Sequence, residues 1–239
     1  MKLTARSVVL SVLLGAHPAW ATVAELIRLT DDFGINENAL RVALTRMVAA
    51  GDLIRSADGY RLSDRLLARQ QRQDEALAPR LDAWDGSWTT LVITVVGVDA
   101  KTRAAIRKTL QDTRFAELRE GVWLRPANLD VALTDELRGR VRILRSRDDE
   151  PAALAGLLWD LPAWSATGHR LLDEMAGAQT VPQRFVVAAA MVRHLLTDPL
   201  LPDELLPRGW PGQRLRTAYR GFADELVARR DHIEVEAHR

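Results

Sequence analysis

One segment of the sequence, residues 37–50, carries polar side chains at a spacing suited to reading DNA. Apolar residues at helical spacing are expected to face the protein core: Leu40, Leu44, Met47 and Val48. The opposite face then presents Asn38, Arg41, Val42, Thr45 and Arg46. Arginine and asparagine can form paired hydrogen bonds with base edges, and threonine can reach phosphates or thymine methyl groups. The spacing predicts a recognition helix, with an ordinary amphipathic helix and a solvated arginine face as the alternative.

Local signals predict the elements that would position this helix. A first helix is expected at 4–16. The second begins after the N-cap Thr22, with Glu25 as its capping-box partner, and runs to about Asp32, where Phe33-Gly34 closes it. The third runs from the N-cap Asn36 to Ala50 and is followed by Gly51. Residues 52–55 and 60–62 are expected to be strands joined by an Asp58-Gly59 turn. Three helices followed by a hairpin outline a winged helix-turn-helix.

The hairpin supplies further candidate DNA contacts. Arg55 and Arg61 lie on either side of the turn, and arginines on such a wing typically reach the phosphate backbone or the minor groove. Asn36, at the start of the third helix, completes the predicted set of DNA-binding residues.

The remainder of the chain predicts a linker helix and two further domains. Residues 89–97, 100–113, 115–125, 129–137 and 141–146 are expected to form a β-α-β-β-α-β order, with Asp99 capping the first helix and two strands around Gly121, as in a ferredoxin-like fold. The segments after Pro151 are helical at 152–159, 168–175, 183–197 and 213–227. The fold class is therefore α+β multidomain: a winged helix-turn-helix at 1–63, a linker helix at 64–86, a ferredoxin-like domain at 87–149 and a helical C-terminal domain at 150–239.

Composition excludes several classes of site. Cysteine is absent, which removes disulfides and thiolate chemistry, and the five histidines are scattered without metal-ligand spacing. No apolar run approaches the length of a membrane span, about 20 residues, so no membrane partner is expected. Residues 8–21, which end in Ala19-Trp20-Ala21, leave a secretory signal open. The favoured interpretation is an amphipathic helix in a cytoplasmic protein.

Motifs across the chain resemble the PaaX family, repressors of phenylacetic acid degradation. The segments that carry the resemblance are Phe33-Gly34-Ile35-Asn36-Glu37, the run from Ala39 to Gly51, Trp84-Asp85-Gly86-Ser87-Trp88, Gly121-Val122-Trp123-Leu124-Arg125-Pro126, Trp159-Asp160-Leu161, Asp198-Pro199-Leu200-Leu201-Pro202 and the run from Leu206 to Gly212. The resemblance implies three domains, a homodimer on palindromic operator DNA, and release by an aryl-CoA or acyl-CoA effector. It implies a transcriptional repressor of a catabolic operon and no enzyme.

Large aromatic residues in the second half of the chain predict an effector site. Four residues are candidates for lining it: Trp123, Arg125, Trp159 and Trp164. The site is expected between the middle and C-terminal domains. No catalytic residue, metal site or cofactor is predicted.

A second function class stays open at the middle domain. Asp99, after the first predicted strand, has the position of a carboxylate in small ferredoxin-like nucleases, to which the PaaX middle domain is similar in fold. The alternative is thus a metal-dependent nuclease, against the simpler interpretation of Asp99 as a helix cap.

Overall fold

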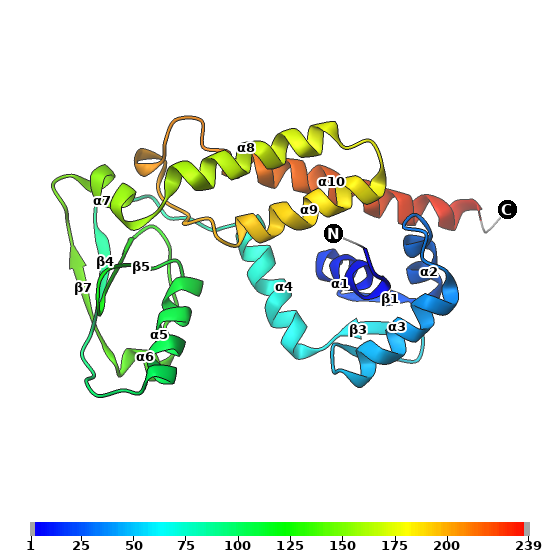
Figure 1. Ribbon diagram of the computed structural model, residues 1–239, viewed down its shortest axis with the longest axis horizontal. Helices are drawn as coiled ribbons and strands as arrows, with labels where there is room; N and C mark the ends of the chain where they lie inside the picture. Colours follow the sequence, from blue (N-terminus) through cyan, green and yellow to red (C-terminus); the bar gives the residue numbers. More distant parts are fainter. Residues whose placement is uncertain (1–2, 237–239) are drawn as a thin grey trace. The chain divides into compact units, whose positions relative to one another are not determined.

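The protein is described by a computed structural model of residues 3–236, with side chains up to residue 227. Its contacts divide the chain into two compact units (Figure 1). Unit 1 comprises Met1–Ala78, Gly168–Leu196 and Gly212–Arg239, and unit 2 comprises Pro79–Thr167 and Thr197–Pro211. Each unit therefore combines segments that are far apart in the sequence.

Unit 1 contains the predicted three helices and hairpin. Its elements in chain order are α1 (Ala5–Gly15), β1 (Trp20–Thr22), α2 (Val23–Asp31), α3 (Glu37–Ala49), β2 (Leu53–Arg55), β3 (Gly59–Leu62), α4 (Asp64–Leu77), α9 (Val181–Leu195) and α10 (Gly212–Glu236). The predicted caps are confirmed. Thr22 and Glu25 form a capping box, the Asn36 side chain accepts from the backbone N–H of Ala39, and Gly51 has a φ of +69°.

The hairpin differs from the prediction in two ways. Residues 20–22, which the sequence analysis did not assign to a strand, form β1, and β1 pairs with β3 to make a three-stranded antiparallel sheet. The predicted Asp58-Gly59 turn is wrong, because Gly59 belongs to β3 and pairs with Thr22. Glycine is required there by space, since a Cβ on Gly59 would lie 2.3 Å from the carbonyl oxygen of Ala21.

Helix α1 forms the centre of unit 1. Val9 and Leu13 pack against Leu40 and Leu44 of α3, with all four side chains buried. The end of α1 is held from α4, because the Gln70 side-chain amide donates to the carbonyl oxygens of Leu13, Leu14 and Ala16. The last carbonyls of a helix lack the usual partner four residues further on. Among the described residues, only the Leu13 oxygen also accepts from a neighbouring backbone group, the Ala16 N–H, so α4 supplies hydrogen bonds at the end of α1 and is an integral part of the unit.

Helices α9 and α10 lie side by side in the same unit (Figure 1). Phe185 of α9 packs edge-on against Phe33, at 4.9 Å between ring centroids, and against Phe222 of α10 at 6.4 Å. Val8 of α1 belongs to the same cluster. Helices α9 and α10 therefore pack on α1.

Unit 2 is built around a four-stranded antiparallel sheet. Its elements are β4 (Trp88–Ile93), α5 (Ala100–Asp112), β5 (Ala116–Arg119), β6 (Val122–Pro126), α6 (Asp135–Arg138), β7 (Val141–Ser146), α7 (Pro151–Leu158) and the 3-10 turn η1 (Asp203–Leu205). The strand order is β5-β6-β4-β7, and the element order β-α-β-β-α-β is the predicted one. Helix α8 (Leu161–Gly177) begins in unit 2 and ends in unit 1.

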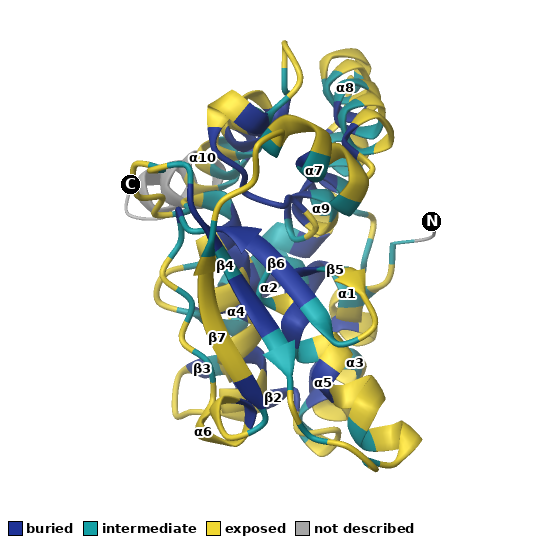
Figure 2. Ribbon diagram, turned by 90° about the vertical axis from the view of Figure 1, so that its left-hand side faces the viewer, coloured by how far each residue is buried: buried dark blue, intermediate teal, exposed yellow. Residues whose placement is uncertain are grey.

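Alternate residues of the central strands β4 and β6 are buried in two separate hydrophobic clusters, one on each face of the sheet. Leu91 and Trp123 pack with Ile106 of α5, whereas Trp88 and Leu124 pack with other side chains on the opposite face. Figure 2 shows β4 and β6 buried, while the edge strand β7 is exposed along most of its length. Both central strands are therefore covered on both faces.

Several predicted boundaries in this region are wrong. The strand from residue 89 ends at Ile93 instead of continuing to 97, and the helix expected over 129–137 is limited to α6. Helix α8 begins at Leu161, seven residues before its predicted start. Within the described residues, no helix combines the length and hydrophobicity that crossing a bilayer demands.

Candidate nucleic-acid interface

Helix α3 has one buried and one exposed face, as its sequence predicts. Leu40, Leu44 and Met47 are at most 1% exposed. The predicted DNA-reading residues all lie on the exposed face: Asn38, Arg41, Val42, Thr45 and Arg46. The hydrophobic core thus fixes the rotation of the helix and turns its polar face to solvent.

Two of these side chains are held along the helix. Arg41 forms an ion pair with Glu37, one turn earlier, with its Nε 2.7 Å from Glu37 Oε1. The Thr45 hydroxyl donates to the carbonyl oxygen of Arg41 at 3.0 Å. Arg41 must leave Glu37 to reach a base edge, and the Glu37 carboxylate would face the negative charge of DNA.

The other predicted residues on and just before α3 differ in whether their side chains have a partner within the protein. The Asn36 side-chain oxygen Oδ1 accepts from the Ala39 N–H at 2.9 Å, so this residue acts as the cap. Arg46 is exposed, and its guanidinium has no partner among the side chains that the structure describes. Val42, 51% exposed, is an apolar side chain presented to solvent, as contact with a thymine methyl group would require.

The two arginines predicted for DNA binding lie in the strands of the hairpin, on opposite faces, because Arg61 pairs with Ile54, the neighbour of Arg55. Arg55 ends β2 and Arg61 lies in β3, and both are exposed. Arg61 Nη1 is 3.9 Å from the carboxylate of Asp64, a residue that is 94% exposed. A contact of this length between exposed groups contributes little and leaves Arg61 available.

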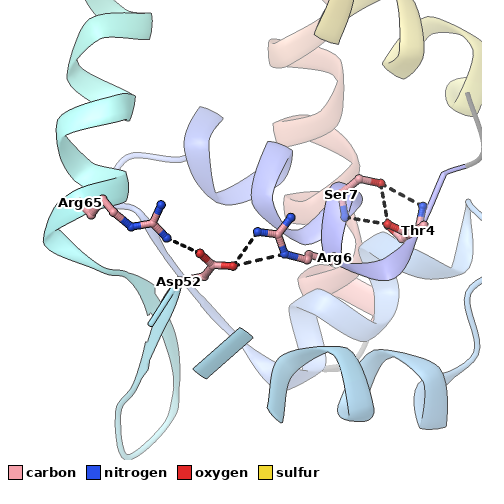
Figure 3. A network of polar contacts seen from close by, with 5 residues as sticks. All are labelled: Thr4, Arg6, Ser7, Asp52 and Arg65. Carbon is pink, nitrogen blue, oxygen red and sulfur yellow. Dashed lines mark hydrogen bonds and ion pairs between the residues drawn. The ribbon is translucent and has the colours of Figure 1, made fainter. Parts of the chain in front are cut away.

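A buried carboxylate that the sequence analysis missed positions the hairpin. Asp52, just before β2, accepts from Arg6 of α1 and from Arg65 of α4 (Figure 3). Its side chain is 3% exposed, whereas Arg6 and Arg65 are 60% and 68% exposed. In the sequence, Asp52 is marked only by its position between the helix-capping Gly51 and a predicted strand. Its partners Arg6 and Arg65 are distant in sequence, so no local pattern indicates the ion pairs.

The residues predicted for effector binding lie in unit 2, on both faces of its sheet. Trp123 and Arg125 lie on the sheet face covered by α5, while Trp159 stacks on Trp88, at 6.4 Å between centroids, on the other face. Trp164 stacks on Trp210 at 4.3 Å. These four positions stay a prediction for effector binding, and the cavity described below is lined by other residues.

Arg125 is buried, and among the described side chains no carboxylate lies against its guanidinium. It donates to the carbonyl oxygens of Pro126 and Thr113 and to Asn128 Oδ1, at 3.1–3.3 Å. Burial, together with the charge of Arg114, lowers the pKa of Arg125 to about 10. Asn128 in turn donates to the Leu200 carbonyl, so the arginine braces the end of β6 against the loop around Leu200.

Asp99 acts as the N-cap of α5. Its carboxylate accepts from the N–H and hydroxyl of Thr102 at 2.8 and 3.0 Å, and these hydrogen bonds lower its pKa. Across residues 3–227, no group of three or more His, Asp or Glu side chains is placed to hold a metal ion.

Comparisons with known proteins agree along the chain. Family models match at residues 4–66, described as PaaX-like protein, at 81–153, described as PaaX protein central Cas2-like domain, and at 162–234, described as PaaX-like protein C-terminal domain. The chain is 29% identical over 225 residues to the transcriptional repressor PaaX of Escherichia coli strain K12, covering 81% of this chain and 70% of that protein. It is also similar to the solved structure of the uncharacterised Mycobacterium tuberculosis protein Rv0674, with 66% identity, a TM-score of 0.88, and coverage of 97% of this chain and 99% of that one.

Proposed function

The chain belongs to the PaaX-like protein family, and we propose that it is a transcriptional regulator that binds operator DNA through α3 and the β2–β3 hairpin. One observation carries the proposal: α3 buries Leu40, Leu44 and Met47 and presents Arg41, Thr45 and Arg46 to solvent. Arginines placed in this way can read guanine edges in the major groove.

The hairpin arginines complete the interface in this proposal. Arg55 and Arg61 contact phosphates beside the groove that α3 enters, and they contribute affinity without sequence information. A homodimer would place two copies of α3 on the half-sites of a palindrome, about one helical turn apart.

We further propose that the regulator represses a catabolic operon and is released by an acyl-CoA or aryl-CoA effector. Release requires the effector to bind the DNA-free arrangement more tightly than the DNA-bound one, because a ligand with equal affinity for both shifts nothing. A coupling of about 1–3 kcal/mol between effector and operator would be typical. Such a regulator acts where the chromosome is, in the cytoplasm.

A gel-shift experiment tests the proposal. The purified full chain is titrated against the DNA upstream of its own gene and against a scrambled duplex of equal length, each with and without a panel of acyl-CoAs. We expect binding to the upstream DNA that survives competition by the scrambled duplex and weakens with an acyl-CoA. Equal binding to both duplexes would contradict a sequence-specific regulator.

A further inference from the structure

Unit 1 contains a cavity of about 360 Å³ between N-terminal helices and the C-terminal helices α9 and α10. Its walls come from α1, α2 and α4 on one side and from α9 and α10 on the other. Small-molecule sites in proteins typically measure about 300–1,000 Å³. The cavity is thus large enough for a compact apolar group, and all its walls belong to one unit.

The interior of the cavity is apolar. Leu14, Phe185, Val192 and Phe222 contribute side chains that are at most 8% exposed. Phe185 and Phe222 also belong to the aromatic cluster that joins α9 to α10. Such a lining favours an aromatic ring or an alkyl chain over a polar ligand.

The charged residues of the lining are two arginines. Arg69 of α4 and Arg193 of α9 are exposed, on helices that pack against each other, and His17 follows α1. His17 lies 3.3 Å from Asp74, outside the lining. Within residues 3–227 neither Arg69 nor Arg193 has a hydrogen-bond or ion-pair partner. Two such guanidinium groups beside an apolar interior suit an anion.

A neutral hydroxyl adds a hydrogen-bonding group to the wall. The Tyr219 oxygen accepts from the Gln73 amide at 3.4 Å. Burial, then the charge of Asp74, raises the pKa of Tyr219. The hydroxyl therefore keeps its proton at neutral pH, and that proton is suited to an anionic oxygen.

We propose that this cavity is a regulatory site for a small amphipathic anion, with an aromatic or alkyl group among the buried side chains and its anionic head at Arg69 and Arg193. A free carboxylic acid and its CoA thioester share this chemistry. The cavity admits the acyl group of a thioester, and the nucleotide lies outside it beside the arginines. The regulatory part rests on the proposed function, whereas ligand binding does not.

Occupancy would act on α3 through α2. Leu29 of α2 lines the cavity, and only residues 32–36 separate α2 from α3. A ligand that touches α1, α2 and α10 together fixes their spacing. The orientation of α3 relative to the C-terminal helices then depends on occupancy, which lowers operator affinity if the bound arrangement misplaces the helix.

Binding is tested with full-length protein and the fluorescent anion 8-anilinonaphthalene-1-sulfonate. Ala223→Trp places a large ring in the cavity, and Thr217→Trp on the exposed surface of the same helix is its control. The Arg69→Ala, Arg193→Ala double variant removes the anion partners, and Arg72→Ala, exposed one turn further along α4, is its control. Circular dichroism verifies the fold of each variant.

We expect wild type and both controls to bind the probe alike, the double variant to bind about tenfold more weakly or worse, and Ala223→Trp not to bind. Folded variants that bind like wild type, or a wild type that does not bind the probe, would overturn the proposal. If Ala223→Trp does not fold, the double variant alone tests the proposal. Its two arginines are exposed, so replacing them is not expected to disturb the fold.

Displacement identifies the ligand. If octanoate displaces the probe, the free acid is supported as the ligand. If octanoyl-CoA displaces it and octanoate does not, the thioester is supported. Displacement by CoA alone, without an acyl group, would overturn the assignment of the apolar interior.

Gel shifts with the displacing ligand test regulation separately. A ligand that binds in the cavity and leaves operator affinity unchanged overturns the regulatory part. If the protein binds no DNA while probe binding follows the cavity variants as expected, the proposed function fails and the binding site is supported.

Discussion

Arg6 donates from both Nε and Nη2 to one carboxylate oxygen of Asp52, at 3.2 and 2.8 Å. The other oxygen of that carboxylate accepts from Arg65 Nη2 at 2.5 Å. Asp52 therefore joins α1, the start of the hairpin and α4 through a single side chain (Figure 3). This junction holds the start of the hairpin against α1 and α4.

Replacing Asp52 by alanine should destabilise unit 1. The exposed Arg6 and Arg65 can return to water, so the loss is that of hydrogen bonds to a charged group, about 1.5–3 kcal/mol in the free energy of unfolding. Urea unfolding followed by circular dichroism measures it. Asp64→Ala, at a 94% exposed carboxylate, is the control, with an expected loss below about 1 kcal/mol. Equal losses would contradict the anchoring role.

Arg41→Ala should reduce specific operator affinity by about 5- to 150-fold, the value of one paired arginine–guanine contact of about 1–3 kcal/mol. Binding to scrambled DNA should change much less. Gel shifts with both duplexes measure the difference. Arg170→Ala, which breaks a similar one-turn ion pair with Glu174 on α8, should leave both affinities unchanged. An Arg41→Ala protein with wild-type operator binding would refute the assignment of α3.

Glu37→Gln tests the ion pair that restrains Arg41. The substitution frees the guanidinium and removes a negative charge from the DNA-facing surface, so operator affinity should rise several-fold. Most of the gain should disappear in the Glu37→Gln, Arg41→Ala double variant, because the part that comes from freeing the Arg41 guanidinium is lost there. A gain that persists in full without Arg41 would show that Glu37 acts only through general repulsion of DNA.

The hairpin arginines should behave differently from Arg41. Arg55→Ala and Arg61→Ala should weaken binding to specific and scrambled DNA alike and should each reduce the salt dependence of affinity by about one phosphate contact. Fluorescence anisotropy at several salt concentrations gives the slope. Lysine at the same positions should largely restore it. A changed base preference in either alanine variant would mean that the hairpin reads bases.

Gly59→Ala should destabilise unit 1, since the new Cβ would meet the Ala21 carbonyl and force β1 away from β3. The expected loss is about 1–3 kcal/mol. Gly221→Ala, in α10 of the same unit with open space around it, should instead stabilise by about 0.4–1 kcal/mol. Thermal melting of both variants checks the opposite signs. Destabilisation by both would mean that general sensitivity, and not the β1–β3 contact, explains the result.

The caps and the helical spacing of the N-terminal segment were readable from the sequence, because they depend on neighbours within one or two turns. Thr22 with Glu25, Asn36 with Ala39, and the buried row of Leu40, Leu44 and Met47 are local relationships of this kind. The exposed face of α3 follows from that burial. The β-α-β-β-α-β order of unit 2 was readable for the same reason.

Relationships between distant residues were decided by the tertiary structure. The pairing of Trp20–Thr22 with β3, the junction at Asp52, and the capping of α1 by Gln70 each join segments with no local signal for one another. The same holds for the packing of α9 and α10 on the N-terminal helices, and so for the cavity between them. A sequence pattern specifies which face of an element is apolar. Which other element covers that face is selected by the shape and packing of the whole chain.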